Sequence, residues 1–391
     1  MGSRFSRRSQ ESERQRSRNA PALPVIALGV VGVLLGTGAT TTAIGMSDRL
    51  PWFADRRPGD AQRYVASDGV WKRPAQVART GDEIPAGQDS DLVTLRNDRT
   101  GEAITVDPHR LQPAGAHLAG GPSKVLVAKG MMVLVDRDGG TLRRIDPVKG
   151  RDLGQVWRSA APVADAVADQ QGTVWVLSTD GRLRGLAWND HAERFGESSE
   201  TQIRRVADDG LLAAHPIGVT VFGPRAGVIA QVGTAHDGYR QSNQLVGIAP
   251  QATDGPADLV VGALPNRSSV VISDRGAVRQ VSTAELGCDR PINPAAFDGR
   301  VYVVCQGDHK VIQLTREGRT AGAAIATPGS GDAEPVADGG RLVLNVGGAG
   351  KGIEIDRAGS EQGSGPTPQP AAPTQTSAAV PTPAAGGGEP G

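Results

Sequence analysis

Residues 174–186, VWVLSTDGRLRGL, carry the pattern that decides the fold. A run rich in valine is followed by the turn Thr179-Asp180-Gly181 and then by a second short run. β-Branched and aromatic runs on either side of an Asp-Gly turn are typical of a β-hairpin. Six further stretches have the same form, and they are centred near residues 99, 139, 225, 275, 308 and 349.

The spacing of these seven hairpins predicts a repeat. With the hairpin near residue 180 included, successive centres lie 40, 41, 45, 50, 33 and 41 residues apart. Groups of four short strands that recur about every 40–45 residues are typical of propeller blades. The strands of a β-sandwich follow one another without such a longer repeat. We expect an all-β domain at residues 62–357, a β-propeller of about seven blades, with six or eight blades or a β-sandwich as alternatives. Residues 64–66 are expected to complete the last blade beside residues 353–355.

An uncharged stretch near the N-terminus predicts a membrane anchor. Residues 22–46 contain no charged side chain, and about 20 apolar residues span the hydrocarbon core of a bilayer. Residues 1–21 carry six arginines and two glutamates, and basic residues favour the cytoplasmic side of a span. We expect a basic cytoplasmic tail at 1–21, a transmembrane signal-anchor helix at 22–46 in contact with membrane lipid, a linker at 47–61 and an extracytoplasmic remainder. A cleaved signal peptide, with a shorter apolar region, is the alternative.

The composition limits the partners of the chain. Its 391 residues include 42 Lys and Arg against 42 Asp and Glu, so the formal net charge is zero. Nucleic-acid binding needs a net basic surface, and we therefore expect no nucleic-acid partner. Residues 358–391 contain seven prolines and no aromatic residue, a composition that cannot bury enough apolar surface to fold. We expect this Pro/Gly/Ala/Thr-rich tail to be disordered.

Few residues are candidates for a site. Cys288 and Cys305 are 17 positions apart, and outside the membrane such a pair is expected to form a structural disulfide. Residues 136–139, DRDG, resemble the start of a calcium loop, but no acidic residue stands at the twelfth position and a hairpin turn explains them. The six histidines lack zinc-binding spacing. We predict no catalytic, cofactor-binding or metal-binding residue.

The layout of the chain resembles that of a known family. The features that carry the resemblance are the basic tail with one membrane span, YVASDGVW at 64–71, TLRNDRTGEAITVDPHRL at 94–111 and VWVLSTDGRLRGL at 174–186. In these the chain resembles actinobacterial membrane-anchored β-propeller proteins, which often carry C-terminal fibronectin type III modules. No strand-rich module follows residue 357 in this sequence. The resemblance implies an anchored extracytoplasmic propeller and implies no catalytic residue.

These observations favour a non-enzymatic cell-envelope protein that presents its propeller as a binding or scaffolding platform for a protein or a wall polysaccharide. One alternative is a propeller enzyme of the lactonase, quinoprotein or glycosidase type, because propellers host many chemistries at their central channel. Another is a transmembrane signalling adaptor, in which the arginine-rich tail contacts a cytoplasmic partner or anionic lipid.

Overall fold

The computed structural model describes seven strands between residues 52 and 118 and, beyond them, residues 123–242, 245–251, 255–328, 331–338, 340–346, 352–357 and 361–363. The chain divides into two compact units, Met1–Gly45 and Met46–Gly391, and all described residues belong to the second. The predicted cytoplasmic tail and the predicted span at 22–46 therefore lie outside the described residues. Among the described residues, no helix has the length and apolar character needed to cross a bilayer.

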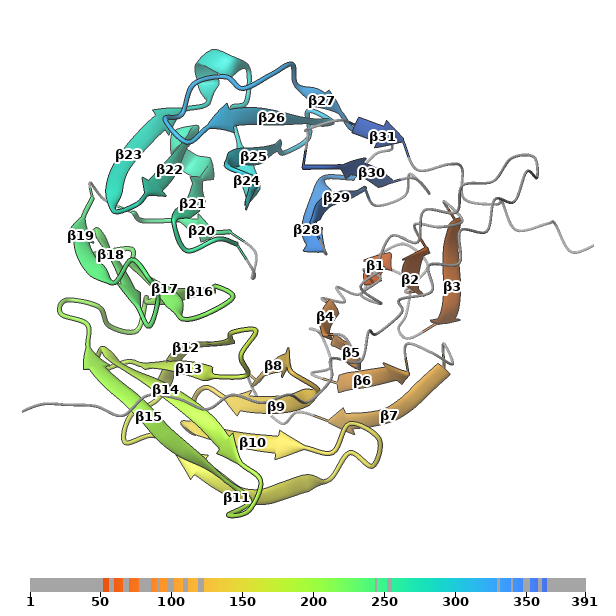
Figure 1. Ribbon diagram of the computed structural model, residues 1–391, viewed down its shortest axis with the longest axis vertical. Helices are drawn as coiled ribbons and strands as arrows, with labels where there is room; N and C mark the ends of the chain where they lie inside the picture. The colour runs from red at the N-terminus through yellow and green to blue at the C-terminus, as the bar shows by residue number, and fades with distance from the viewer. Residues whose placement is uncertain are drawn as a thin grey trace, which may run out of the picture. The chain divides into compact units, whose positions relative to one another are not determined.

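In its described parts the second unit is all-β apart from two single turns of 3-10 helix, η1 (Pro265–Arg267) and η2 (Ala284–Leu286). Its strands form seven four-stranded sheets and one three-stranded sheet, and every sheet consists of consecutive antiparallel strands (Figure 1). The three-stranded sheet contains β1 (Trp52–Asp55), β2 (Asp60–Val65) and β3 (Val70–Gln76).

The four-stranded sheets follow one another along the chain. The first contains β4 (Ala86–Asp89), β5 (Leu92–Arg96), β6 (Glu102–Asp107) and β7 (Gln112–Leu118). The second contains β8 (Ser123–Ala128), β9 (Met131–Asp136), β10 (Thr141–Ile145) and β11 (Asp152–Arg158). The third contains β12 (Val163–Ala168), β13 (Val174–Ser178), β14 (Arg182–Asn189) and β15 (Arg194–Gln202). The next two contain β16 (Leu211–Ala214), β17 (Val219–Gly223), β18 (Val228–Val232), β19 (Gly238–Gln241), then β20 (Ala249–Pro250), β21 (Leu259–Leu264), β22 (Ser269–Asp274), β23 (Ala277–Ser282). The last two contain β24 (Pro291–Phe297), β25 (Arg300–Cys305), β26 (Lys310–Thr315), β27 (Ile325–Ala326), then β28 (Ala333–Asp338), β29 (Arg341–Val346), β30 (Gly352–Ile355), β31 (Glu361–Gly363).

Each predicted hairpin lies in a different four-stranded sheet. Six of them join the second and third strands of their sheet, as β13 and β14 do, whereas the hairpin near Arg275 joins the third and fourth strands, β22 and β23. The equivalent hairpin of that sheet, β21–β22, is centred near Asn266, 41 residues after the preceding centre and 42 before the next. The irregular spacings of 50 and 33 residues therefore come from the choice of hairpin, and the repeat itself is even.

Consecutive sheets pack side by side. The first strands of neighbouring four-stranded sheets are in contact along the whole series, from β4 against β8 to β24 against β28. Figure 1 shows these first strands on the inside of the series and the fourth strands on the outside. Successive four-stranded antiparallel sheets packed in this order form a propeller-like arrangement. The first strands β12, β24 and β28, which precede three of the predicted hairpins, are rich in alanine, and β24 and β28 also contain proline.

The core lies between neighbouring sheets and is mainly aliphatic. Leu177 on β13 and Val221 on β17 are both fully buried in one cluster shared by two sheets, and burial of such a side chain stabilises the fold by about 1.5–3 kcal/mol. Close approach requires glycine at Gly218, which has φ +83°, because a Cβ there would lie 2.5 Å from the backbone of Gly233. The low aromatic content is therefore compatible with dense packing.

The strand series extends beyond the predicted domain at both ends. β1 lies inside the predicted linker 47–61 and β31 inside the predicted tail 358–391. Their sequences, WFAD and EQG, are too short to show a β-type alternation. The expectation that residues 64–66 complete the last sheet is wrong, because Tyr64 and Val65 belong to β2, which pairs with β1 and β3. The last sheet is completed by β31, which pairs with β30.

Candidate functional site

Polar side chains gather at the inner edge of the sheets that begin with β8, β12 and β16. Asp165 on β12 is 8% exposed and follows a register shift in the strand, a type of irregularity that redirects side chains. Its Oδ1 lies 2.8 Å from the Lys124 Nζ on β8, and its Oδ2 accepts a hydrogen bond of 2.9 Å from the Leu212 backbone N–H on β16. Asp165 therefore ties the first strands of three consecutive sheets together.

Asp169 makes a second tie of the same kind. It lies just after β12, is 2% exposed, and accepts four hydrogen bonds. Three donors are local: the backbone N–H groups of Gln171 and Thr173 and the indole Nε1 of Trp175. The fourth, the Gly218 N–H at 3.1 Å, belongs to the first hairpin of the next sheet. A buried carboxylate with four donors is a structural group, because all its lone pairs are engaged.

His215 connects the next two sheets. Its ring is fully buried, with Nδ1 2.8 Å from the Gly255 carbonyl oxygen and Nε2 2.6 Å from the Thr220 Oγ1. A carbonyl only accepts, so Nδ1 carries the proton, and Nε2 then accepts from the threonine hydroxyl in the neutral ring. Burial lowers the pKa of His215 from its ordinary value, against the opposing effect of the bond to Gly255. Burial and the hydrogen bond that Nε2 accepts from Thr220 therefore favour the neutral form of the His215 ring.

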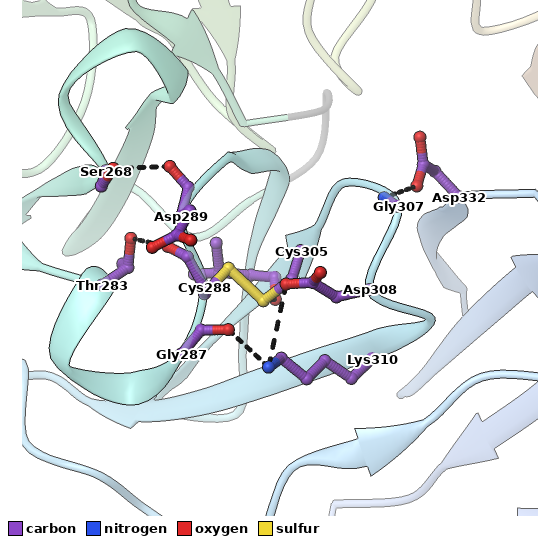
Figure 2. Close-up of a disulfide and its surroundings, with 11 residues drawn as sticks. Ser268, Thr283, Gly287, Cys288, Asp289, Cys305, Gly307, Asp308, Lys310 and Asp332 are labelled. Atoms are coloured by element: carbon purple, nitrogen blue, oxygen red, sulfur yellow. Dashed lines mark hydrogen bonds and ion pairs between the residues drawn. A yellow bond between two sulfur atoms is a disulfide. The ribbon is translucent and has the colours of Figure 1, made fainter.

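The predicted disulfide is present, and Figure 2 shows its surroundings. It joins the turn after η2 to the last residue of β25, with the Cα atoms of Cys288 and Cys305 5.2 Å apart. Both cysteines are buried in the core shared by the sheets that begin with β20 and β24. The Thr283 hydroxyl donates to the Cys288 carbonyl at 2.7 Å, and the Lys310 ammonium donates to the Gly287 carbonyl. The bond therefore fastens the connection between these two sheets to β25.

The calcium-like motif is a turn, as predicted. The Gly139 N–H donates to Asp136 Oδ1 at 2.9 Å within the β9–β10 hairpin. Asp274, the last residue of β22, and Asp308, in the β25–β26 turn, form ion pairs with Arg316 and Lys310. In the described parts of the chain no three His, Cys, Asp or Glu side chains are grouped so that they could hold a metal ion.

Sequence reasoning missed an aromatic and charged cluster on the outer strands. Trp188, at the end of β14, lies edge-on to Phe195 of β15 with ring centroids 5.0 Å apart, and the Arg144 guanidinium from β10 stacks on the indole at 4.8 Å. The Asp190 Oδ1 accepts from both the Trp188 Nε1 and the Arg144 Nη1 at 3.0 Å. The hydrogen bond from Arg144 lowers the pKa of Asp190 from its ordinary value. The only sequence signal was a tryptophan in a chain with 3% aromatic residues.

Beside this cluster runs the most exposed strand of its sheet. In β15 every residue except Phe195 faces solvent, and the strand pairs only with β14 among the described strands. Arg184 lies on the neighbouring strand β14, and its side chain is only 8% exposed. It contacts two glutamates of β15, Glu200 at 2.8 Å and Glu197 at 3.5 Å. We call Arg144, Trp188, Asp190, Glu197 and Glu200 the outer-strand surface. It combines an aromatic ring, fixed charges and an exposed strand.

Comparisons with known proteins show the fold. No protein-family model and no curated protein matches the sequence. Among solved structures, BamB from Moraxella catarrhalis is 17% identical, with a TM-score of 0.53 over 75% of this chain and 88% of that one. The dihydro-heme d1 dehydrogenase NirN is 12% identical, with a TM-score of 0.56 over 81% of this chain and 73% of that one. Apo AztD from Citrobacter koseri is 10% identical, with a TM-score of 0.50 over 80% and 92%. BamB and NirN are β-propeller proteins, and this chain has a propeller-like all-β fold.

Proposed function

We propose that the protein is a non-enzymatic cell-envelope protein whose propeller is a binding platform for an envelope protein or wall polysaccharide. The outer-strand surface carries this proposal. Tryptophan and arginine are enriched among the residues that dominate binding energies, and here Arg144 is stacked on Trp188 and hydrogen-bonded to Asp190. Such a preorganised group loses little side-chain freedom when a partner binds.

The ionisable groups of the inner strands support the same proposal. Asp165, Asp169 and His215 have the chemical character of acid–base catalysts, but each is engaged by neighbouring sheets. Their hydrogen bonds stiffen the joints between sheets. A stiff frame that presents an exposed outer surface is suited to binding.

We also propose that the propeller lies outside the membrane, anchored through residues 22–46 with the N-terminus in the cytoplasm. The Cys288–Cys305 disulfide supports an extracytoplasmic position, because disulfides persist in oxidising compartments and are rare in the cytosol. Cysteine accessibility tests this orientation. A cysteine introduced at Ser3 should be labelled by an impermeant maleimide only after the cells are opened, and labelling in intact cells would contradict it.

Cross-linking in intact cells tests the binding surface. Trp188→Ala removes the ring that Arg144 covers, and we expect it to reduce recovery of a cross-linked envelope partner from the full chain. Tyr239→Ala is the matched control, because Tyr239 is an exposed aromatic residue, 44% accessible, on the outer strand β19 of another sheet. Equal recovery with both variants would contradict the proposed surface. A divalent ion or organic cofactor bound at one per chain in the purified protein would favour the enzymatic alternative.

A further inference from the structure

The accessible charge of the outer-strand surface is negative, and this limits the partners that it can bind. Residues 190–202, the β14–β15 turn and β15, contain four carboxylates and one arginine, so their formal charge is −3 with histidine neutral. The neighbouring strand β11 adds no net charge, because it contains one aspartate and one arginine. All five charged side chains of residues 190–202 are exposed, namely Asp190, Glu193, Arg194, Glu197 and Glu200.

The arginines that hold these carboxylates are largely covered. The Arg144 side chain is 22% exposed and that of Arg184 only 8%. By contrast, Asp190 is 83% exposed, and Glu197 and Glu200 are each 48% exposed. Charges at a surface act on a partner within about 8 Å at physiological ionic strength. A partner therefore meets the carboxylates before it meets the arginines, and positively charged groups on the partner are favoured.

A bulge in β15 brings two of the carboxylates to one guanidinium. The pairing of β15 with β14 shifts register at Ser198, which has no partner residue on β14. Residues three apart in a regular strand point to opposite faces. Across this shift, however, Glu197 and Glu200 both reach the Nε of Arg184, at 3.5 Å and 2.8 Å. One arginine thus holds two carboxylates and neutralises only one of the two negative charges.

The guanidinium of Arg184 can donate further hydrogen bonds. It carries five N–H donors, and within the described parts of the chain only its Nε contacts an acceptor. Polar groups of largely buried side chains are normally hydrogen-bonded, so the two Nη atoms favour an acceptor that a partner supplies. The main chain of a peptide supplies such acceptors through its carbonyl groups, next to side chains that can carry positive charge.

These observations indicate the chemistry of the partner. Resting on the proposed binding platform, we propose that the outer-strand surface docks an extended basic segment of an envelope protein. Lysine or arginine side chains of the segment contact Glu197 and Glu200, and its carbonyl groups accept hydrogen bonds from Arg184. A neutral polysaccharide offers no positive charge to these carboxylates. Charged residues and a bulge on an edge strand oppose its pairing with a further strand, so the contact is made through side chains of β15.

Binding of labelled probes to the full chain in detergent tests the proposal. The basic probe is a fluorescent peptide of the length of β15, nine residues, in which lysine alternates with threonine. The neutral probe has serine in place of lysine, and the glycan probe is a labelled hexasaccharide of N-acetylglucosamine. We expect only the lysine peptide to bind, with an affinity that falls about tenfold or more between about 50 and 500 mM salt. Equal binding of the lysine and serine peptides would overturn the proposal.

A pair of charge variants locates the binding. Glu197→Gln with Glu200→Gln removes two negative charges with little change of shape and should weaken binding of the lysine peptide by about three- to tenfold, because each exposed charge pair contributes modestly. The matched control is Glu285→Gln with Glu317→Gln, which removes the same charge from two exposed glutamates after β23 and after β26. Equal weakening by both pairs would overturn the proposal, because binding would then follow the overall charge.

Folding of the variants is checked by their unfolding midpoints. If Glu197→Gln with Glu200→Gln does not fold, Glu197→Gln alone is compared with Glu285→Gln alone. This single variant keeps the closer contact of Arg184, with Glu200 at 2.8 Å.

Cross-linking in intact cells separates this proposal from the proposed function. If Trp188→Ala reduces recovery of the partner but Glu197→Gln with Glu200→Gln does not, the surface binds a partner of different chemistry and the basic segment is refuted. Binding of the hexasaccharide that is lost in Trp188→Ala would also refute it, in favour of a wall polysaccharide. Unchanged recovery in all these variants would contradict the binding surface itself.

Discussion

The tie made by Asp165 gives the sharpest test of how the sheets are held together. Replacement by alanine removes the acceptor for the N–H groups of Leu212 and Ala166, whose residues are 6% and 0% exposed. Each buried donor left without a partner costs about 1–3 kcal/mol. The Lys124 contact adds little, about 0.5 kcal/mol, because that side chain is 37% exposed and screened by water. We expect Asp165→Ala to lower the free energy of unfolding by about 2–6 kcal/mol.

Urea unfolding of the full chain in detergent, followed by tryptophan fluorescence, measures this loss. Trp175 on the adjacent strand β13 is 6% exposed and reports on the same sheet. Asp165→Asn keeps one acceptor oxygen, so its loss should be intermediate. Lys124→Met should cost less than either, since both backbone donors keep their acceptor. Asp138→Ala, at an exposed turn, is the control for removal of an aspartate and should change stability by less than about 0.5 kcal/mol.

The order of the variants matters more than any single value. A loss for Asp165→Ala that is no larger than that for Asp138→Ala would refute the view that Asp165 holds three first strands together. A loss for Lys124→Met equal to that for Asp165→Ala would show that the ion pair, and not the backbone N–H groups, is the main contribution of this carboxylate.

Three further predictions concern the other joints between sheets. Asp169→Ala leaves the Trp175 Nε1 and the Gly218 N–H without their acceptor and should lower the free energy of unfolding by about 2–4 kcal/mol in the same assay, whereas an unchanged midpoint would argue against the tie. Cys288→Ser with Cys305→Ser should cost about 3 kcal/mol, the loop entropy of a bond across this separation, with reduction of the wild-type bond giving the same shift. Because burial lowers the folded-state pKa of His215, the unfolded chain binds this proton at higher pH. The contribution of His215 to stability is therefore complete above about 6.5 and is lost as pH falls from there to the folded-state pKa. His215→Gln should flatten stability in that window, and an equally steep profile in this variant would assign the pH dependence to other groups.

Much of the fold could be predicted because the repeat produces short-range sequence patterns that can be recognised locally. The hairpin at 174–186 is recognisable from β-prone runs and an Asp-Gly turn, and the other six share its form. What the patterns could not assign was the place of each hairpin within its sheet. The turns near Asn266 and near Arg275 lie in one sheet, and only the strand pairing shows which of them is equivalent to the others.

The outer-strand surface could not be predicted from local sequence patterns for a similar reason. Arg144 and Trp188 are far apart in sequence and come from different sheets, so no motif joins them. Their contact depends on how the sheet that begins with β8 packs against the sheet that begins with β12. The β11–β15 contact on the same side shows that the outer strands of these sheets meet.

The all-β repeat, the turn at residues 136–139 and the pairing of the two cysteines follow from the amino-acid sequence alone, because they depend on local propensity, periodicity and the number of cysteines. The tertiary structure alone decided the roles of Asp165, Asp169 and His215. Their partners across the joints lie 40 to 49 residues away, about one repeat along the chain. A side chain that bonds to the neighbouring repeat is indistinguishable in sequence from a turn residue, because its environment is created only when one sheet packs against the next.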